Sequence, residues 1–242
     1  MTASATIPSI AAQSEVVPGL DEFGIRAFTT TRATGSFGLQ TDEPVGVVMG
    51  RWSALRRELR PSGRRFATAS QVHGATVLEH RPGWEGWLRA EDADGHVAME
   101  RGTAIAVTIA DCVPVFIAHP SGAIAILHSG WRGTAARIVE RGIDALVAHG
   151  LRAADLRLHC GPAICGKCYE VSADVYAQLT GRNPGAPTTI DLRALIAEHA
   201  ARAGLTHITT SSSCTRCDND RFYSHRAGDA GRQLGVMIAD AR

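Results

Sequence analysis

Short apolar runs and amphipathic segments are mixed along the chain, and their spacing predicts both strands and helices. Alternating or continuous apolar residues predict strands at 14–19, 24–30, 64–72, 75–81, 103–109, 113–118, 122–128, 155–160, 205–210, 221–226 and 232–239. Helical spacing predicts helices at 42–60, 133–149, 170–180 and 189–204. Because the two kinds of element do not alternate strictly, the pattern favours a single α+β domain of layered mixed sheets with flanking helices.

Turn and capping residues set the predicted boundaries of these elements. Pro61 ends the first helix, Gly150 suits the C-cap of the helix at 133–149, and Ser172 and Asp191 suit the starts of the last two. The segment 81–96 is rich in turn residues and predicts a surface loop. Residues 1–13 are polar and aperiodic, so we expect them to be disordered and the folded domain to cover 14–242.

Composition excludes several classes of partner. The 242 residues carry a formal charge of +1 and are 45% hydrophobic, which gives ample core and no net-charge argument for nucleic acid or a membrane surface. No apolar run is long enough to span a bilayer, and the N-terminus lacks the features of a signal peptide. The six cysteines are therefore expected to be reduced in the cytoplasm.

Three predicted strand ends carry side chains that bind soft metals. His73 lies in "SQVHG", Cys112 in "ADCVP" and His128 in "LHSGWRG". Their long spacing matches no local zinc motif, but it suits a catalytic site assembled from several strands, in which zinc takes three protein ligands. Isolated residues of these types are also common as buried or surface side chains, so spacing alone leaves both interpretations open.

The chain resembles the laccase-domain family, which is described as multicopper polyphenol oxidase and is associated with purine nucleoside phosphorylase activity. The resemblance is carried, in one order, by "FTTTRATGS", "QVHG", "ADCVPV", "HSGWRGT", "CGPAIC…CYEV" and "DRFYSHRAGDAGR". It implies an α+β fold of stacked layers, a laccase-domain-type catalytic domain over 14–242, and a zinc site made by His73, Cys112 and His128.

The same resemblance implies an activity and further site residues. The activity is phosphorolysis of adenosine, inosine, guanosine and methylthioadenosine with inorganic phosphate, and adenosine deamination is a second reaction. Arg132, at the expected start of the helix at 133–149, is the candidate phosphate ligand, since a helix N-terminus and a guanidinium both favour anions. Arg32 and Gln71 are further candidates for substrate binding, and Asp111 for orienting a metal-binding histidine or accepting a proton.

The sequence departs from the family pattern at one motif. Cys165, Gly166 and Lys167 stand where the family's "GPAIGPCCYEV" has Gly, Pro and Cys, although Cys168 is retained. The change creates the C-x-x-C pair Cys165/Cys168, and a second such pair, Cys214/Cys217, lies further along the chain. The 45 residues between them exceed the spacing of a zinc ribbon and include a predicted helix pair, which argues against one shared Cys₄ zinc site.

Three other functions stay open at this stage. A copper-dependent polyphenol oxidase is disfavoured because no two of the ten histidines form the H-x-H pairs of a trinuclear copper centre, although a Cys/His₂ site can bind copper. A cysteine hydrolase would use Cys112 as its nucleophile, with His128 or His73 as the base. A non-enzymatic purine sensor would keep the pocket without turnover.

Overall fold

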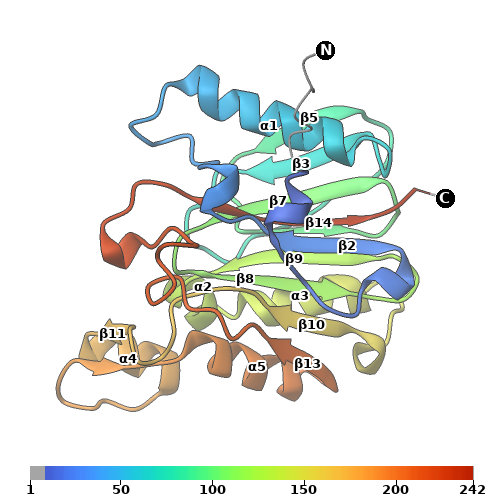
Figure 1. Ribbon diagram of the computed structural model, residues 1–242. Coiled ribbons are helices and arrows are strands. Elements are labelled where there is room, and N and C mark those ends of the chain that lie inside the picture. The colour runs from blue at the N-terminus through green and yellow to red at the C-terminus, as the bar shows by residue number, and fades with distance from the viewer. Residues whose placement is uncertain (1–8, 242) are drawn as a thin grey trace.

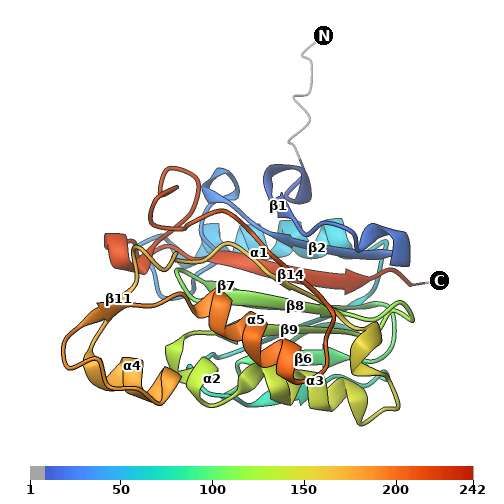
Figure 2. The ribbon, with the colours of Figure 1, turned by 90° about the horizontal axis from the view of Figure 1, so that it is seen from below.

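Two six-stranded mixed sheets are stacked face to face, with helices on both outer sides (Figures 1 and 2). The computed structural model describes residues 9–241. The layers follow the order α1, first sheet, second sheet, and then α2, α3 and α5. The predicted α+β fold of layered mixed sheets with flanking helices is therefore confirmed. No helix in the described range is long and apolar enough to cross a membrane.

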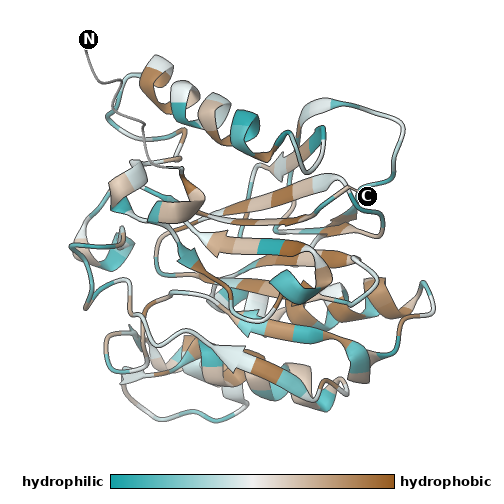
Figure 3. Ribbon diagram, turned by 45° about the vertical axis from the view of Figure 1, so that its right-hand side comes forward, coloured by the Kyte–Doolittle hydropathy of each residue, from teal (hydrophilic) through white to brown (hydrophobic). Residues whose placement is uncertain are grey.

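The central strands of the first sheet are buried on both faces, and β14 (Gln233–Ala239) is one of them. The order of this sheet is β1 (Glu15–Val16), β2 (Ile25–Thr29), β14, β7 (Thr103–Ile109), β3 (Arg65–Ala69) and β5 (Gly86–Ala90). Alternate side chains of β14 point to opposite layers: Val236 packs toward α1, and Met237 packs toward the second sheet. Figure 3 shows hydrophobic residues concentrated in these inner strands.

The second sheet places the predicted metal ligands. Its order is β13 (His207–Thr210), β10 (Arg157–Cys160), β8 (Val113–Ala118), β9 (Ile124–Ser129), β6 (Gly95–Ala98) and β4 (Val77–Glu79). The β8–β9 hairpin is buried throughout, and its register pairs Val113 with Ser129 and Pro114 with His128. This register sets Cys112, just before β8, beside the end of β9.

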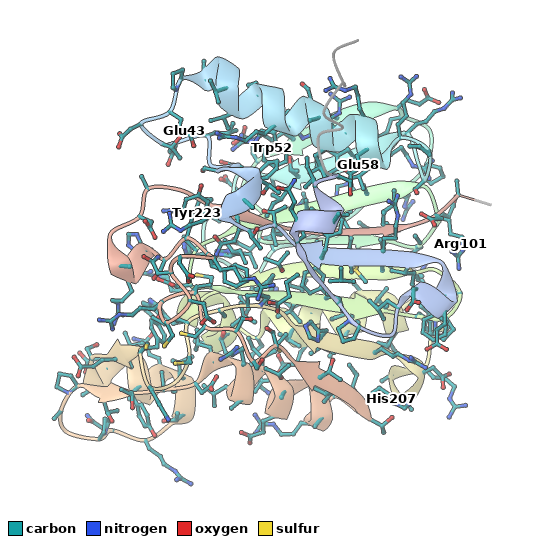
Figure 4. The ribbon with its side chains drawn as sticks, in the orientation of Figure 1. Glu43, Trp52, Glu58, Arg101, His207 and Tyr223 are labelled. Atoms are coloured by element: carbon teal, nitrogen blue, oxygen red, sulfur yellow. The ribbon has the colours of Figure 1, made fainter. Side chains whose placement is uncertain are left out.

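Helix α1 (Val45–Leu59) covers the first sheet with a stripe at helical spacing: Val48, Trp52, Leu55 and Leu59. Trp52 points from α1 into this layer (Figure 4) and its ring stacks on Trp87 at a centroid distance of 4.9 Å. The second sheet is covered by α2 (Trp131–Ala135), α3 (Ile138–Val147) and α5 (Leu192–Arg202), while α4 (Ala173–Thr180) and the β11–β12 hairpin (Glu170–Val171, Thr188–Thr189) extend from one end.

Two predicted helix starts are confirmed and one predicted helix is broken. The Ser172 hydroxyl accepts from the Val175 amide, and the Asp191 carboxylate accepts from the amides of Arg193 and Ala194. The predicted helix at 133–149 is instead the pair α2 and α3, because Arg137 adopts a left-handed conformation with φ of 64°.

The predictions for two other segments are wrong. The segment 81–96, expected to be a surface loop, contains β5 and the start of β6, whose pairing with β3 and β9 outweighs its turn-rich composition. The expected strand at 221–226 is a loop with the 3₁₀ helix η5 (His225–Ala227). Its backbone is held by side chains, since the Ser224 amide donates to Asp229 and the Tyr223 amide to Gln233.

The predicted disordered start covers residues 1–13, of which 1–8 lie outside the described residues. The amides of Ile10 and Ala11 donate to the carboxylate of Glu58, labelled in Figure 4, at 2.7 and 3.0 Å. The 3₁₀ helix η1 (Ala11–Gln13) follows. Regular structure therefore begins before residue 14.

Candidate metal centre

The three predicted ligands meet where two connections from the first sheet to the second pass the end of β9. His73 lies in the turn between β3 and β4, Cys112 in the turn between β7 and β8, and His128 near the end of β9. One potential ligand atom from each lies within 4.8 Å of the others. The two imidazole rings meet edge to face, with centroids 4.8 Å apart. Residues separated by up to 55 positions are thus brought together by strand pairing.

The turn that carries His73 is held by a buried carboxylate. His73 has φ of 60°, a conformation that a non-glycine residue adopts at a free-energy cost. Asp94 is 0% exposed and accepts from three consecutive amides, those of Val72, His73 and Gly74, at 3.2, 3.0 and 2.7 Å. These charge-assisted hydrogen bonds offset the backbone cost and fix where His73 points.

The same carboxylate orients His128. The Nδ1 atom of His128 lies 2.8 Å from Oδ1 of Asp94. The hydrogen bonds from His128 and the turn amides lower the pKa of Asp94, despite burial that acts to raise it. Because an ionised carboxylate only accepts, Nδ1 carries the proton that faces Asp94, and Nε2 is the ring nitrogen that can bind a metal once it has lost its own proton. A carboxylate behind a ligating histidine is a recurrent feature of metal sites.

Asp94 was not found by sequence analysis. It belongs to the segment 81–96, which was expected to be exposed. Its only signal is that it directly precedes the short apolar run that becomes β6.

Cys112 and His128 shift each other's pKa toward the charged forms. Burial acts to raise the pKa of the Cys112 thiol, but the charge and hydrogen bonds of His128 and His73 outweigh it and bring the pKa to about 6. Burial acts to lower the pKa of His128, whereas the Cys112 thiolate and Asp94 raise it to about 9. A thiolate therefore exists at neutral pH, and a cation bound there would replace the proton on His128.

The donor set and its surroundings fit a metal ion. One thiolate and two imidazoles are a ligand set of catalytic zinc sites, and the same set also binds copper. A Cβ at Gly130 would lie 2.8 Å from the Cys112 sulfur, so the absence of a side chain there leaves room beside the thiolate. The cluster thus has the ligands, the supporting carboxylate and the space that such a site needs.

The cluster opens into a cavity of about 550 Å³. His73, Cys112 and His128 line one part of it, while Trp87 and Tyr169 add aromatic surface. Its size falls within the range of small-molecule sites.

Arginines give the cavity a positive character. Arg132 lies over the Trp131 ring at 4.3 Å, and Arg226 lies 5.2 Å from the centre of the Tyr169 ring. Arg132 is exposed and makes no side-chain hydrogen bond to any residue between 9 and 241. Its guanidinium therefore keeps its donors for a ligand.

The remaining predicted site residues are engaged in structural contacts. Asp111 and Gln71 both line the cavity, but Asp111 accepts from the Thr215 hydroxyl at 2.6 Å and the Arg226 amide at 2.7 Å. The Gln71 side chain exchanges hydrogen bonds with Thr108. Asp94, and not Asp111, makes the hydrogen bond that orients His128.

Arg32 lies away from the lining of this cavity. Its guanidinium donates to the carbonyls of Asn219 and Phe222, pairs with Asp229, and lies 4.3 Å from the ring centre of Tyr223, labelled in Figure 4. These contacts fold the loop that carries Arg226 into the cavity.

The 45 residues between the two C-x-x-C pairs argued against a shared site, but the fold brings the pairs together. Sulfur atoms of Cys165, Cys168, Cys214 and Cys217 all lie within 4.8 Å of one another. The isolated parallel bridge between Ala163 and Cys214 brings the two segments together. Spatial proximity therefore exists without the short spacing of a zinc ribbon.

The chain is similar in sequence to purine nucleoside phosphorylases and in fold to a solved structure. Purine nucleoside phosphorylase ORF3 of Streptomyces griseus is 31% identical over 211 residues, covering 84% of this chain and 85% of that protein. The purine nucleoside phosphorylase of Deinococcus radiodurans is 34% identical over 211 residues, covering 82% and 79%. The crystal structure of YlmD from Geobacillus stearothermophilus superimposes with a TM-score of 0.84 at 26% identity, covering 93% of this chain and 94% of YlmD.

A model of one protein family extends over the same part of the chain. The model described as "Multi-copper polyphenol oxidoreductase laccase" matches residues 28–240, which include both sheets' central strands and all three clustered ligands. Since that match spans nearly the whole described fold, the chain belongs to the multi-copper polyphenol oxidoreductase laccase family.

Proposed function

We propose that the protein is a metal-dependent purine nucleoside phosphorylase. It would convert adenosine, inosine, guanosine or methylthioadenosine and inorganic phosphate to the free base and a ribose-1-phosphate. The observation that carries the proposal is the single cavity in which the His73/Cys112/His128 cluster lies with the unpaired guanidinium of Arg132. The names of the relatives from Streptomyces griseus and Deinococcus radiodurans support the same activity.

Zinc is the proposed metal, held by His73, Cys112 and His128. When bound, it supplies Lewis-acid chemistry at the cavity. The protein's own contribution is to keep the ligands in place: Asp94 fixes the His73 turn and the tautomer of His128, and Gly130 leaves space beside Cys112. The Cys112 thiolate must stay reduced, which makes the cytoplasm the proposed location.

Arg132 is the proposed phosphate ligand. A guanidinium can hold two phosphate oxygens by parallel hydrogen bonds, and the Trp131 ring beneath Arg132 limits the conformations of its side chain. Its donors have no partner within the described chain, so binding phosphate breaks no existing hydrogen bond. Trp87 and Tyr169 offer aromatic faces of the kind on which a purine base stacks.

Adenosine deamination is the proposed second reaction at the same site. Asp111 remains the proposed proton acceptor and Gln71 a proposed substrate contact, because both line the cavity. Arg32 is proposed to act on substrate only through the 219–229 loop that its guanidinium holds.

The decisive experiment measures phosphate dependence. Inosine is incubated with and without inorganic phosphate, and free base and ribose-1-phosphate are quantified for wild type, Arg132→Ala and Arg132→Lys. A lost charge-assisted hydrogen bond costs about 1.5–3 kcal/mol, so Arg132→Ala should lower phosphorolysis by about ten- to a hundredfold, and lysine should restore only part of it. Arg152→Ala, which changes an exposed arginine outside the cavity, should keep full activity.

Two outcomes would contradict the assignment. Base release without phosphate would make the reaction a hydrolysis. Equal loss of phosphorolysis and deamination in a zinc-loaded Arg132→Ala protein would assign Arg132 to nucleoside binding or to the fold, because deamination uses water and not phosphate.

A polyphenol oxidase is the second candidate, favoured by the description of the matching family. A cluster of one cysteine and two histidines can bind copper as well as zinc. Within residues 9–241, however, the groups able to hold a metal are this cluster and the four cysteines, which do not resemble a trinuclear copper centre. Turnover of a chromogenic phenol by copper-loaded protein, absent in Cys112→Ser, would support the oxidase.

A cysteine hydrolase is distinguished by the state of Cys112. Its pKa near 6 would make it nucleophilic without metal, whereas a ligating thiolate is protected. Alkylation of Cys112 by iodoacetamide should therefore be slow in zinc-loaded protein and fast after chelation. Activity that increases on chelation would favour the hydrolase.

A further inference from the structure

The four cysteines Cys165, Cys168, Cys214 and Cys217 lie outside the metal centre described above and come from two different connections. The first pair follows β10, and the second follows β13, its parallel neighbour in the second sheet. The parallel bridge between Ala163 and Cys214 continues this pairing beyond the strands, and the Thr215 amide donates to the Ala163 carbonyl at 3.2 Å. The two C-x-x-C turns therefore face each other by sheet geometry.

The backbone around the Cys214 sulfur suits a thiolate. The amides of Cys165 and Cys217 both point at the Cys214 sulfur, at 3.2 and 3.4 Å. In the first turn, the Cys168 amide donates to the Cys165 carbonyl at 2.9 Å and so brings both sulfurs to one side. Hydrogen bonds from amides to sulfur favour the ionised form that a metal requires.

Basic residues stand next to the four cysteines in the sequence. Four thiolates and one divalent cation carry a net charge of about −2. Each pair has a basic residue directly before its second cysteine, Lys167 in "CGKC" and Arg216 in "CTRC". Arg216 also donates across the cluster to the Cys168 carbonyl at 3.3 Å. The Arg216 guanidinium therefore offsets part of the excess negative charge.

The sulfur separations fit coordination and not disulfides. All six cysteines are free thiols, and the Cys168 and Cys217 sulfurs are 3.5 Å apart, far beyond a sulfur–sulfur bond. In a tetrahedron with Zn–S bonds of about 2.3 Å the sulfurs are about 3.8 Å apart, which agrees with four sulfurs within 4.8 Å. We propose that Cys165, Cys168, Cys214 and Cys217 bind a second zinc ion, in a closed structural site.

This zinc would hold together the two connections that form one side of the cavity. Ile164 and Tyr169 flank the first pair and line the cavity. Thr215, within the second pair, donates to Asp111, the neighbour of Cys112. The chain after Cys217 leads into the 219–229 loop, which brings Arg226 to the cavity. The proposed site is thus structural, and it does not depend on which reaction the cavity catalyses.

Metal content of purified full-length protein tests the proposal. After dialysis against a chelator at low concentration, wild type should retain about two zinc ions per chain by elemental analysis. The variant Cys168→Ser/Cys217→Ser and the variant Cys112→Ser should each lose one. Cys160→Ala, which changes a buried cysteine outside both clusters, should keep both. Equal zinc content in wild type and in Cys168→Ser/Cys217→Ser would overturn the proposal.

If Cys168→Ser/Cys217→Ser does not fold, X-ray absorption spectroscopy of the zinc in Cys112→Ser protein tests the proposal instead. In Cys112→Ser protein the four cysteines are intact, so the remaining zinc should show four sulfur neighbours at about 2.3 Å and no nitrogen. Nitrogen neighbours on that zinc, or iron in its place, would overturn the assignment. Titration of denatured, unreduced wild type should give six thiols. A shortfall of two or four thiols would show disulfides and would also overturn it.

Discussion

Replacing Asp94 by Asn should weaken the candidate metal centre without removing any proposed ligand. The carboxylate accepts four N–H groups: Oδ1 takes those of His73 and His128, and Oδ2 takes those of Val72 and Gly74. An asparagine keeps one acceptor oxygen and presents an NH₂ group to the other two donors. Whichever way the amide is turned, two N–H groups lose their acceptor.

The expected magnitudes follow from this geometry. If the NH₂ group faces His128, the imidazole must accept at Nδ1, which moves its proton to Nε2 and removes the lone pair for the metal. If it faces Val72 and Gly74, the His73 turn loses two of its three amide contacts. Second-shell changes of this kind lower metal affinity by about 10- to 100-fold. The loss of two part-buried hydrogen bonds should lower the free energy of unfolding by about 1–3 kcal/mol.

Zinc affinity should be measured by competition with a chromogenic chelator, and stability by urea denaturation. Asp111→Asn is the matched control, because Asp111 is also a buried carboxylate near the cluster but its partners are Thr215 and Arg226. The control should keep the zinc affinity of the wild type. Wild-type affinity in a folded Asp94→Asn protein would refute the role assigned to Asp94.

Three further changes test the site and the core. Gly130→Ala should lower zinc affinity, because its Cβ would lie 2.8 Å from the Cys112 sulfur; Gly50→Ala, where a Cβ meets nothing within 4 Å, should leave affinity unchanged in the same chelator assay. Burial, partly opposed by Glu15, lowers the pKa of His159 to about 4. The neutral imidazole therefore favours the folded state fully above pH 6.5, and this stability is lost as the pH falls toward 4 and the unfolded chain takes up the proton first. Between pH 7.5 and 5, urea denaturation should show His159→Gln gaining about 2 kcal/mol relative to wild type, and a constant difference would refute the shift. Leu55→Ala should lower the free energy of unfolding by about 2–5 kcal/mol, because Leu55 is fully buried between α1 and the first sheet; Val47→Ala, on the exposed face of α1, should change it by less than about 0.5 kcal/mol, and equal losses would contradict this packing.

The proposed ligands were predictable because their signals are local. His73, Cys112 and His128 each stand at the end of a strong apolar run, and two connections between the sheets converge at the end of β9. Whether they bind zinc stays a prediction, but their meeting in space is an observation. The N-caps Ser172 and Asp191 were predictable for the same reason, since a cap depends on residues within one turn.

The features that were missed depend on distant parts of the chain. Asp94 lies between two short strands whose composition is that of a loop, and only pairing with β3 and β9 makes them strands. The helix break at Arg137 leaves the apolar spacing of 138–147 intact, so periodicity could not reveal it. The loop at 221–226 alternates like a strand, but contacts with Arg32 and Asp229 decide its path. The four cysteines meet through strand pairing that no spacing rule anticipates.

The central place of β14 in the first sheet has a consequence for how the chain is synthesised. β14 is made after all the other described strands, yet it pairs with β2 on one side and with β7 on the other. Until the ribosome has released it, β2 and β7 cannot be joined, and each presents an unpaired edge of N–H and C=O groups. The first sheet can therefore close only after β14 has been synthesised. A premature stop codon shortly before residue 233 would remove the middle of that sheet and expose its apolar faces to aggregation.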